Sequence, residues 1–331
     1  MFFGEVPLAK AEGAILAHSL ALPGGRLRKG LILAPEHLSL IAASGLERIV
    51  VAIPAPDDLG EDAAALQIAQ AVAGPGVELR AVGTGRVNLH ATAPGLARLV
   101  AEQIHAANAV DPMLTLATVP DLHRLDPGGM IATVKVISYA VPRRAVEAVV
   151  RAASGAISLA PAVWAEAALI ETQIAGQDTG PKGARVTEAR LARLGLRMTT
   201  PIHVAHEASA LAAAIRAAPG EGPLLILTAS ATSDPQDVGP AALRLAGGEV
   251  LRVGMPVDPG NLLFLGRYQK RPVLGLPGCA RSPALNGADW VLERICCGIA
   301  VTACDIAAMG LGGLLVEMPS RPHPRMTPRA P

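Results

Sequence analysis

The sequence predicts an α/β protein whose second half is a three-layer sheet domain, preceded by a mixed α/β or β-containing accessory domain. Apolar residues make up 51% and charged residues 17% of the chain, which excludes a disordered protein. From about Ala165 onward, short apolar runs alternate with helix-like segments, and this alternation is typical of βαβ crossovers in a parallel sheet. The 331 residues suit two domains, which we place at 1–164 and 165–318, followed by a flexible tail at 319–331.

The first half contains several β-rich runs between helices. Its expected elements, in chain order, are a helix at 35–44, a strand at 48–53, a polar loop at 54–61 leading into an Ala-rich helix, a strand at 77–82, a helix at about 94–108, and strands at 115–119 and 131–141. Gly83 and Gly85 lack the third glycine and the acidic partner of a dinucleotide-binding fingerprint, so we interpret them as a turn.

In the second half, expected strands and helices alternate more regularly than in the first. Leu224–Leu227 is a short, fully apolar run of the kind buried in parallel sheets. The other expected elements are a strand at 169–172, a helix from Thr179-Gly180-Pro181 to about Leu194, a strand near Ile202, a helix with Ala208, Leu211 and Ile215 on one face, a helix at 238–245, strands near Val250 and at 272–276, and a long helix from about Ala284. The apolar stretch 298–316 predicts a buried helix followed by a strand rather than a membrane span, since Asp305 interrupts it.

The charge balance argues against a nucleic-acid partner. The chain carries 29 basic and 28 acidic residues and only 2% aromatics, whereas nucleic-acid binders need a basic excess and stacking side chains. The basic clusters at 26–29, 143–144 and 270–271 are expected to be solvated turns. The set Arg185, Glu188 and Arg190 is expected to form a solvated helix face, while Lys135, inside a β-run, is a candidate anion contact.

The cysteines and the N-terminus indicate a soluble cytoplasmic protein. Cys279, Cys296, Cys297 and Cys304 contain no C-x-x-C pair, so we expect reduced and mostly buried thiols. The N-terminus reaches Glu5 without a basic region before an apolar core, which is unlike a secretory signal. His203-x-x-His206-Glu207 lacks the H-E-x-x-H order, so we expect a capping or surface role and no metal site.

Two loops follow predicted strands, where ligands of parallel α/β sheets bind. Thr228–Asp237 is rich in hydroxyl groups and leads into a helix N-terminus, a favourable place for a phosphate. Leu276–Ser282 offers small residues, which allow a ligand to approach the backbone, and Arg281, which can pair with phosphate. The alternative interpretation is that both loops are polar capping turns.

The stretch from about Leu169 to Gly298 resembles the molybdopterin-binding domain shared by MogA-type and MoeA-type proteins and gephyrin. The resemblance lies in the strand and loop 224–237, Pro259-Gly260-Asn261, the strand with Leu-Pro-Gly at 272–278, and the helix from Ser282 onward. In addition, Gly30–Val51 resembles the helix and strand that precede this domain in the MoeA type.

The resemblance implies that the ligand is molybdopterin or its adenylylated form, with Mg²⁺ as a further candidate cofactor. It implies a catalytic role for Asp237. The implied cofactor-binding residues are Thr228, Ser230, Thr232, Ser233, Asp234, Pro277, Gly278, Cys279, Arg281 and Ser282. The sequence departs from the family at 229–231, where Ala-Ser-Ala replaces a pair of glycines, at Asn261, where the family has Lys, and at Cys279-Ala280, where it has Asn-Pro. These departures favour binding over full catalytic competence.

Three stretches, Gly85–Leu89, Ala132–Val136 and Gly275–Asn286, resemble a subgroup in which this part is fused to a MobA-type nucleotidyltransferase. No segment after Pro319 matches that domain, so we expect that it is either a separate protein or has been cut away. The resemblance implies a MobA-like nucleotidyltransferase or a molybdoenzyme as partner. The first half is expected to support homo-oligomer formation. The function classes that stay open are a molybdopterin binder in molybdenum-cofactor biosynthesis, a molybdotransferase-type enzyme, and a scaffold or regulatory protein that kept the fold without the ligand.

Overall fold

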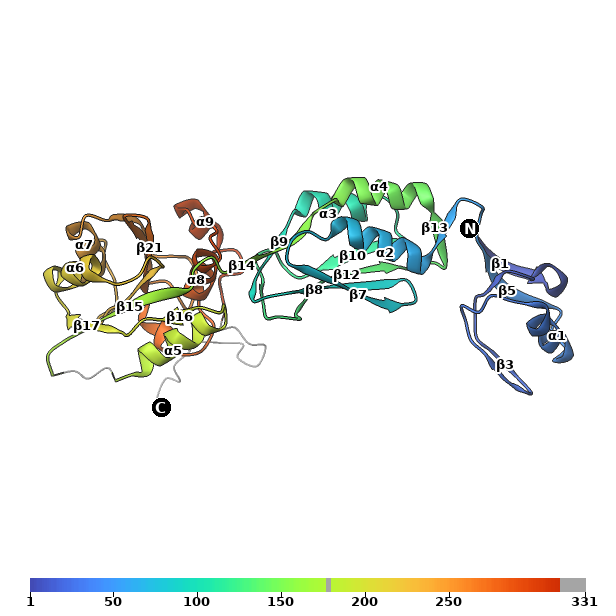
Figure 1. Ribbon diagram of the computed structural model, residues 1–331, viewed down its shortest axis with the longest axis horizontal. Helices are drawn as coiled ribbons and strands as arrows, with labels where there is room; N and C mark the ends of the chain where they lie inside the picture. The colour runs from blue at the N-terminus through green and yellow to red at the C-terminus, as the bar shows by residue number, and fades with distance from the viewer. Residues whose placement is uncertain (177–179, 316–331) are drawn as a thin grey trace, which may run out of the picture. The chain divides into compact units, whose positions relative to one another are not determined.

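The computed structural model describes residues 1–176 and 180–315 (Figure 1). The chain divides into two compact units: Met1–Ala93 with Ala97–Leu159, and Pro94–Leu96 with the chain from Ala160 on. Both units contain helices and sheets, so the mixed α/β class predicted from the sequence is confirmed. Thr179, at the predicted start of a helix, and the predicted tail at 319–331 lie outside the described residues.

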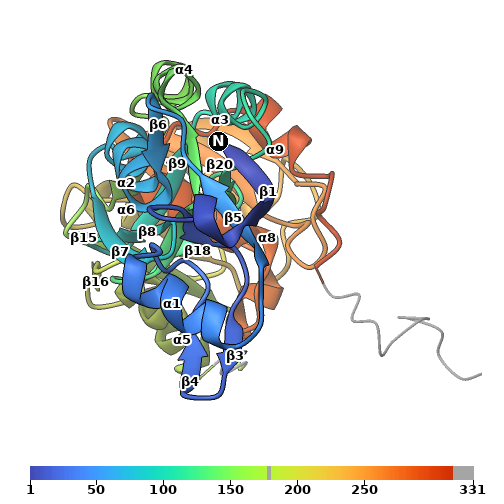
Figure 2. The ribbon, with the colours of Figure 1, turned by 90° about the vertical axis from the view of Figure 1, so that its right-hand side faces the viewer.

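The first 53 residues form a three-stranded antiparallel sheet, a separate two-stranded hairpin and one α-helix (Figure 2). The helix α1 (Pro35–Ala43) and the strand β5 (Arg48–Ile53) have the predicted positions. The sequence did not predict the other strands of this region. The strands β1 (Phe2–Pro7) and β2 (Ile15–Leu16) pair with β5, and β3 (Leu20–Leu22) pairs with β4 (Gly25–Leu27). Leu16, Ile41 and Val51 belong to the buried core that these elements share.

The rest of the first unit packs helices against a four-stranded antiparallel sheet of order β10-β12-β8-β7. Figure 1 shows α2, α3 and α4 on one side of this sheet. The bounds are β7 Val77–Gly83, β8 Arg86–Ala91, β10 Leu114–Thr118, β12 Met130–Val136, α2 Glu61–Val72, α3 Ala101–Asn108 and α4 Arg143–Ala153. The predicted turn at Gly83 and Gly85 connects β7 and β8, and both glycines have positive φ.

Three predictions for the first unit are wrong. The helix predicted at 94–108 begins only at Ala101, because Gly95–Leu99 forms β9 and pairs with β11 (Arg124–Leu125) and β14 (Ile157–Pro161). The strand predicted at 131–141 is interrupted after Val136, and β13 (Ala140–Pro142) pairs instead with β6 (Asp58–Gly60). Arg143-Arg144 begins the helix α4 instead of forming a turn. In the two strand cases, pairing with a distant segment overrides the local pattern.

The second unit is built on a seven-stranded sheet of order β16-β15-β18-β21-β20-β19, with β17 also paired to β15. The bounds are β15 Glu166–Gln173, β16 Arg197–Met198, β17 Ile202–Ala205, β18 Leu224–Leu227, β19 Glu249–Val253, β20 Phe264–Tyr268 and β21 Arg271–Leu276. The strands β15, β18 and β21 are parallel, as predicted. The strand β20 was not predicted; a two-residue turn joins it to β21, and so short a connection permits only antiparallel pairing.

Helices α6 (Ala208–Ala217) and α7 (Val238–Leu245) pack on one face of this sheet and share a buried core with Ile170, Ile226 and Phe264. Strand side chains alternate between faces, so Leu227 and Glu171 lie on the opposite face. There Leu227 and Glu171 lie close to Gly183 of α5 (Lys182–Ala192). The remaining helices are α8 (Gly287–Cys296) and α9 (Ala303–Ala308).

The segment after Gly298 differs from its prediction. The helix α9 has six residues and is mostly exposed, with Ile306 buried on its inner side. The only strand-like contact between 298 and 315 is a single bridge from Leu314 to Asp258, and Val316 lies outside the described residues. In the part of the chain that the structure describes, no helix has the length and apolar character needed to cross a membrane.

The solvated turn predicted at 270–271 is correct for the exposed Lys270 and wrong for Arg271, which is buried at the start of β21. Its guanidinium donates hydrogen bonds to the carbonyls of Gly222, Ala218 and Pro219, which follow α6, at 2.7, 2.8 and 2.9 Å. The planar fork of donors in arginine suits several acceptors at once. Burial lowers the pKa of Arg271 below its usual value.

Candidate functional site

The two predicted loops lie side by side at the carboxyl ends of the parallel strands β18 and β21 of the seven-stranded sheet. The strands β18 and β21 run parallel with Leu227 opposite Leu276, so the loops that follow them start at the same level. The Arg281 Nη2 atom donates a hydrogen bond of 3.3 Å to the carbonyl of Thr228 and thereby connects the loops. The predicted meeting of these loops is confirmed, whereas their role in binding stays a prediction.

The first loop has a buried base and an exposed rim. Thr228 and Thr232 are buried, and the amide of Ala229 donates to Thr172 Oγ1 at 2.8 Å. Ser230 and Ser233 are exposed. The exposed Asp234 accepts a hydrogen bond of 2.7 Å from the amide of Gln236, so its carboxylate shapes the loop. The rim therefore offers hydroxyl groups and one loop-bound carboxylate.

Asp237 is the N-cap of α7. One oxygen of its carboxylate accepts from the amide of Val238 at 2.8 Å, and the other accepts from the amide of Ser233 at 3.1 Å. This geometry closes the loop onto the helix and satisfies backbone donors that would otherwise lack partners. The structure therefore gives Asp237 a capping role, and its catalytic role stays a prediction.

The second loop begins with buried Pro277 and continues as a short 3-10 helix, Gly278–Arg281. Gly278 and Cys279 are exposed, and Arg281 and Ser282 are half-buried. Gly260, in the loop between β19 and β20, has φ +138°, and a Cβ there would lie 2.6 Å from the amide nitrogen of Gly287 at the start of α8. Only glycine allows this approach, which places the Pro-Gly motif against the N-terminus of α8.

Arg190 holds the second loop, and the solvated position predicted for it is wrong. It is buried, forms an ion pair with Asp289 of α8, and donates to the carbonyls of Ala280, Ser282 and Ala284. The sequence carried a signal for this position, since the buried residues of α5 follow helical spacing: Gly183, Thr187, Arg190 and Leu191. The two other residues of the predicted face, Arg185 and Glu188, are exposed.

Glu171 is a site residue that the sequence analysis missed. It lies near the end of β15 and is 1% exposed. Its Oε1 atom is 3.6 Å from Arg281 Nη1, and its Oε2 atom is 3.8 Å from His203 Nδ1. Among the described residues, neither carboxylate oxygen has a hydrogen-bond partner, and nor does Arg281 Nη1. The sequence feature that could have identified Glu171 is an acidic residue at the end of an apolar run that forms a buried parallel strand, where charged residues are rare.

Because Gly183 has no side chain, the start of α5 lies close to Glu171 and Arg281. A Cβ at Gly183 would lie 2.5 Å from Leu227 Cδ2, 2.6 Å from Glu171 Oε1 and 2.8 Å from Arg281 Nη1. At these distances a side chain at position 183 would displace the ends of the three side chains, so glycine allows the close approach without rearrangement. Partial positive charge at the N-terminus of a helix favours a nearby carboxylate.

The two histidines border the same region. His206 Nδ1 is 2.8 Å from Thr172 Oγ1, and His203 Nδ1 is 3.3 Å from Gln173 Nε2. His203 is 48% exposed. Within 1–176 and 180–315, no group of three His, Cys, Asp or Glu residues is arranged to hold a metal ion.

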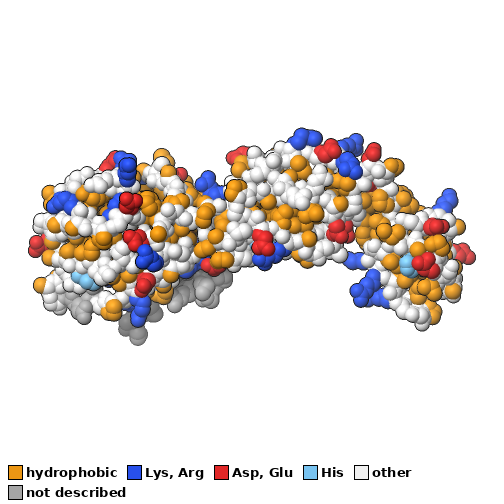
Figure 3. All heavy atoms as spheres, in the orientation of Figure 1, with side chains coloured by type: hydrophobic (Ala, Val, Ile, Leu, Met, Phe, Trp, Pro, Cys, Tyr) orange, Lys and Arg blue, Asp and Glu red, His pale blue; other side chains and the backbone are white. Residues whose placement is uncertain are grey.

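Lys135, the candidate anion contact of the first unit, is engaged inside that unit. Its Nζ atom donates to the carbonyl of Thr84 and lies 3.9 Å from Glu61 Oε2. The charge of Lys135 is thus matched by a neighbouring carboxylate. On the face drawn in Figure 3, basic and acidic side chains are interspersed among hydrophobic ones.

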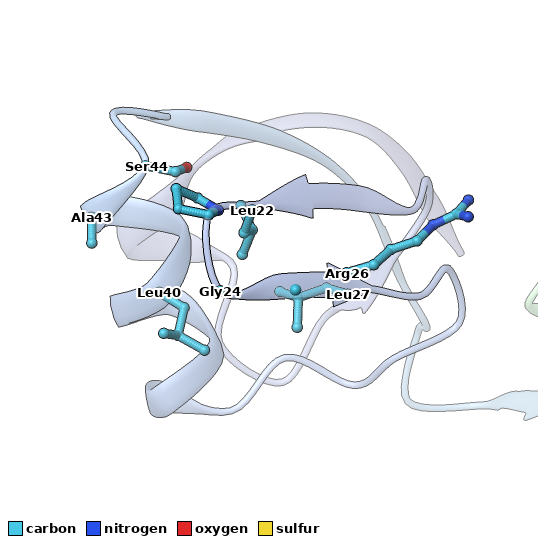
Figure 4. Close-up of a pocket in the computed structure, with 9 residues that line it drawn as sticks. Leu22, Gly24, Arg26, Leu27, Leu40, Ala43 and Ser44 are labelled. Atoms are coloured by element: carbon cyan, nitrogen blue, oxygen red, sulfur yellow. The ribbon is translucent and has the colours of Figure 1, made fainter.

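Two cavities lie away from Glu171 and Arg281. One of about 340 Å³ lies between α1 and the β3–β4 hairpin and is lined mainly by apolar residues such as Leu22, Leu27 and Leu40 (Figure 4). The other, of about 420 Å³, runs along α5 beside the second loop and is lined by Lys182, Arg185, Val186, Ala189, Arg190, Arg193 and Pro283. Neither cavity is lined by Glu171 or Arg281.

Comparison with known proteins gives limited matches. Residues 5–53 match a family described as "Domain of unknown function (DUF8806)". No curated protein matches the chain. Among solved structures, the molybdopterin biosynthesis MoeA protein from Pyrococcus horikosii matches with 16% identity and a TM-score of 0.29, covering 89% of this chain and 75% of that one. A TM-score this low does not establish a common architecture.

Proposed function

We propose that the second unit is a three-layer molybdopterin-binding domain and that the chain acts in molybdenum-cofactor biosynthesis by binding or delivering the pterin. The observation that carries this proposal is the contact of the two loops through Arg281 at the carboxyl ends of β18 and β21. Ligands of parallel α/β sheets bind beyond the carboxyl ends of the strands. The motifs that resemble the molybdopterin-binding family lie in the same two loops.

The chemistry of the site fits a phosphorylated pterin. Arg281 is 22% exposed, and within the described residues it makes one hydrogen bond, of 3.3 Å, to the Thr228 carbonyl. Its Nη1 is buried against Glu171, so the other donors of its guanidinium are the ones that could bind a phosphate. The hydroxyl groups of Ser230 and Ser233 lie on the exposed rim and add donors. Behind Arg281, the buried oxygens of Glu171 have no hydrogen-bond donor among the described residues, and Arg281 Nη1 lies 3.6 Å from one of them.

Binding or delivery is favoured over molybdotransferase activity. Both oxygens of Asp237 already accept backbone hydrogen bonds, so the carboxylate contributes to the loop fold. In the alternative, enzymatic function, Asp237 and Asp234 would hold Mg²⁺ beside the ligand phosphate. Two carboxylates near a phosphate repel it unless a cation lies between them. In the third alternative, a scaffold or regulatory protein, the chain would retain no pterin.

A molybdopterin binder must pass its ligand on. We propose a MobA-like nucleotidyltransferase or a molybdoenzyme as the receiving partner, and self-association through the first unit. The exposed apolar side chains of that unit, such as Phe2, Phe3 and Ile32, favour such contacts. Light scattering of the purified chain at micromolar concentration tests the self-association, and a monomeric mass would contradict it.

The direct test is to identify the ligand that the native chain retains. We expect mass spectrometry to show molybdopterin or its adenylylated form, and the oxidised extract to show pterin fluorescence. In titrations with molybdopterin, we expect Arg281→Ala to bind about 10- to 100-fold more weakly, which corresponds to a lost charged hydrogen bond of about 1.5–3 kcal/mol.

Arg267→Ala is the matched control. Arg267 lies on β20 of the same unit, is exposed, and forms a surface ion pair of 2.9 Å with Glu249, so its loss should leave binding unchanged. A wild-type chain that retains no pterin and fails to bind added molybdopterin would overturn the proposed function.

A further inference from the structure

The cavity along α5 combines an apolar floor with cations that lack partners. Its volume of about 420 Å³ lies within the range of about 300–1,000 Å³ that is typical of ligand pockets. Four of its lining residues are spaced three or four apart along α5 and its C-cap: Lys182, Arg185, Ala189 and Arg193. Side chains with this spacing lie on one side of a helix. Pro283 of the second loop lines the cavity from the other side.

Three exposed cations of this cavity are unpaired. The side chains of Lys182, Arg185 and Arg193 form no hydrogen bond or ion pair with a described residue, and none of the described residues that line the cavity is acidic. The remaining exposed arginines of the second unit each have a partner: Arg197, Arg216, Arg244 and Arg267. Within the described part of this unit, exposed arginines without a partner therefore occur only at the cavity. A hollow with unmatched positive charge attracts an anion.

The floor of the cavity is apolar, and its two walls are held together by protein contacts. Three side chains form the floor: Val186, Ala189 and Pro283. The neighbours of Pro283 in the second loop, Ser282 and Ala284, accept hydrogen bonds of 2.8 and 3.2 Å from the buried Arg190 through their carbonyls. Arg190 thus fixes the second loop against α5, and the cavity between them does not need a ligand to form.

From this geometry we propose that the cavity along α5 is a second binding site, which takes a phosphate ester with a planar, largely apolar body. Lys182 and Arg185 lie one helical turn apart and together bind the dianionic phosphate. The body of the ligand packs on the apolar floor, and the planar guanidinium of Arg193 stacks on it. Since Arg281 does not line this cavity, the inference does not rest on the proposed function.

Three probes separate the two parts of the ligand. The compound 1-naphthyl phosphate carries both parts, inorganic phosphate carries only the anion, and 1-naphthol carries only the planar body. In calorimetric titrations of the full chain, we expect 1-naphthyl phosphate to bind at least about 10-fold more tightly than either of the others, because the anion and the body contribute separately. Added salt should weaken its binding, since the cations are exposed. Equal affinity for 1-naphthyl phosphate and inorganic phosphate would overturn the inference.

The double variant Lys182→Gln with Arg185→Gln should bind 1-naphthyl phosphate at least about 10-fold more weakly, which corresponds to the loss of a charged hydrogen bond. Arg267→Gln with Lys270→Gln is the control, because it removes the same charge from exposed positions of the same unit and should keep the wild-type affinity. An equal loss in both double variants would show that only net charge matters and would overturn the inference. Should the first variant fail to fold, Arg193→Gln decides: we expect affinity about 2- to 5-fold lower, and wild-type affinity would overturn the inference.

The Arg281→Ala variant separates this inference from the proposed function. We expect it to bind 1-naphthyl phosphate with wild-type affinity, whereas its affinity for molybdopterin falls. Loss of 1-naphthyl phosphate binding in Arg281→Ala, with full binding in Lys182→Gln with Arg185→Gln, would place the probe at the two loops and overturn the inference. Failure of the wild-type chain to bind 1-naphthyl phosphate also overturns it, and the molybdopterin titration then decides the proposed function by itself.

Discussion

Arg190 of α5 forms a buried ion pair with Asp289 of α8. Asp289 also accepts a 2.9 Å hydrogen bond from the amide of Asn286, within the capping box that begins α8. Arg190 in turn holds three carbonyls of the loop between β21 and α8. One contact thus fixes the helix start and the loop that carries Arg281.

We expect Arg190→Ala to destabilise the second unit by about 3–5 kcal/mol, because it leaves the Asp289 carboxylate buried without its partner. Both tryptophans of the chain, Trp164 and Trp290, belong to this unit, so tryptophan fluorescence during urea unfolding reports on it. Arg185→Ala, on the exposed side of α5, is the control. Equal midpoints for the two variants would contradict the structural role of Arg190.

Substitution of Asp237 distinguishes its capping role from a metal-dependent one. If Asp237 only caps α7, Asp237→Ala should cost about 1 kcal/mol of stability and Asp237→Asn only a few tenths, because Asn caps nearly as well. Molybdopterin binding by Asp237→Asn, measured with and without Mg²⁺, should then equal that of the wild type. Loss of a Mg²⁺-dependent step in a stable Asn variant would instead establish the catalytic role.

Gly183→Ala should both destabilise the second unit and weaken ligand binding. The added methyl group overlaps Leu227, Glu171 and Arg281, and such overpacking costs about 1–3 kcal/mol. Thermal unfolding and a molybdopterin titration measure the two effects. Gly24→Ala is a matched control, since Gly24 has no atom within 4 Å of an added Cβ. Wild-type affinity in Gly183→Ala would show that the close approach is not needed for binding.

The four thiols should differ in reactivity at pH 8. Cys279 and Cys304 are exposed, whereas Cys296 and Cys297 are buried, so the prediction of mostly buried thiols is correct for only two. Burial raises the pKa of Cys297 to about 11 and that of Cys296 further. Both buried thiols therefore stay protonated at pH 8, and only the thiolate reacts.

We expect a maleimide to modify Cys279 and Cys304 in the native chain and all four thiols in urea, as read by peptide mass spectrometry. Bound molybdopterin should slow the modification of Cys279, which lies in the second loop, and leave Cys304 unchanged. Equal rates at all four thiols in the native chain would contradict the burial of Cys296 and Cys297.

The sequence predicted elements whose pattern is local. The helix α7 has the predicted bounds, and β18 is a fully apolar run with four buried residues. The strand β20 was missed although its partner β21 follows after a two-residue turn. The strand β9 was missed because it is held by distant partners, β11 and β14. Local propensity does not contain this information.

The same limit applies to the site. The position of the two loops followed from the rule for parallel sheets, and the structure brings them together. The roles of Arg190 and Glu171 depend on which side chains face each other across α5, β15 and the second loop. A single sequence gives the spacing along each element but does not give the partner on the next one.

The hydrogen bonds from Arg271 to three carbonyls of the segment 218–222 affect how readily proteases cleave this segment. The segment 218–222 connects α6 to β18 and contains Pro219, Gly220, Glu221 and Gly222, a composition that favours nicking in many proteins. Proteases cleave segments that open locally and extend into the active site of the protease. Because Arg271 binds the carbonyls of Ala218, Pro219 and Gly222, this connection cannot open without releasing a buried cation. Its survival under limited proteolysis therefore depends on a side chain about fifty residues further along the chain.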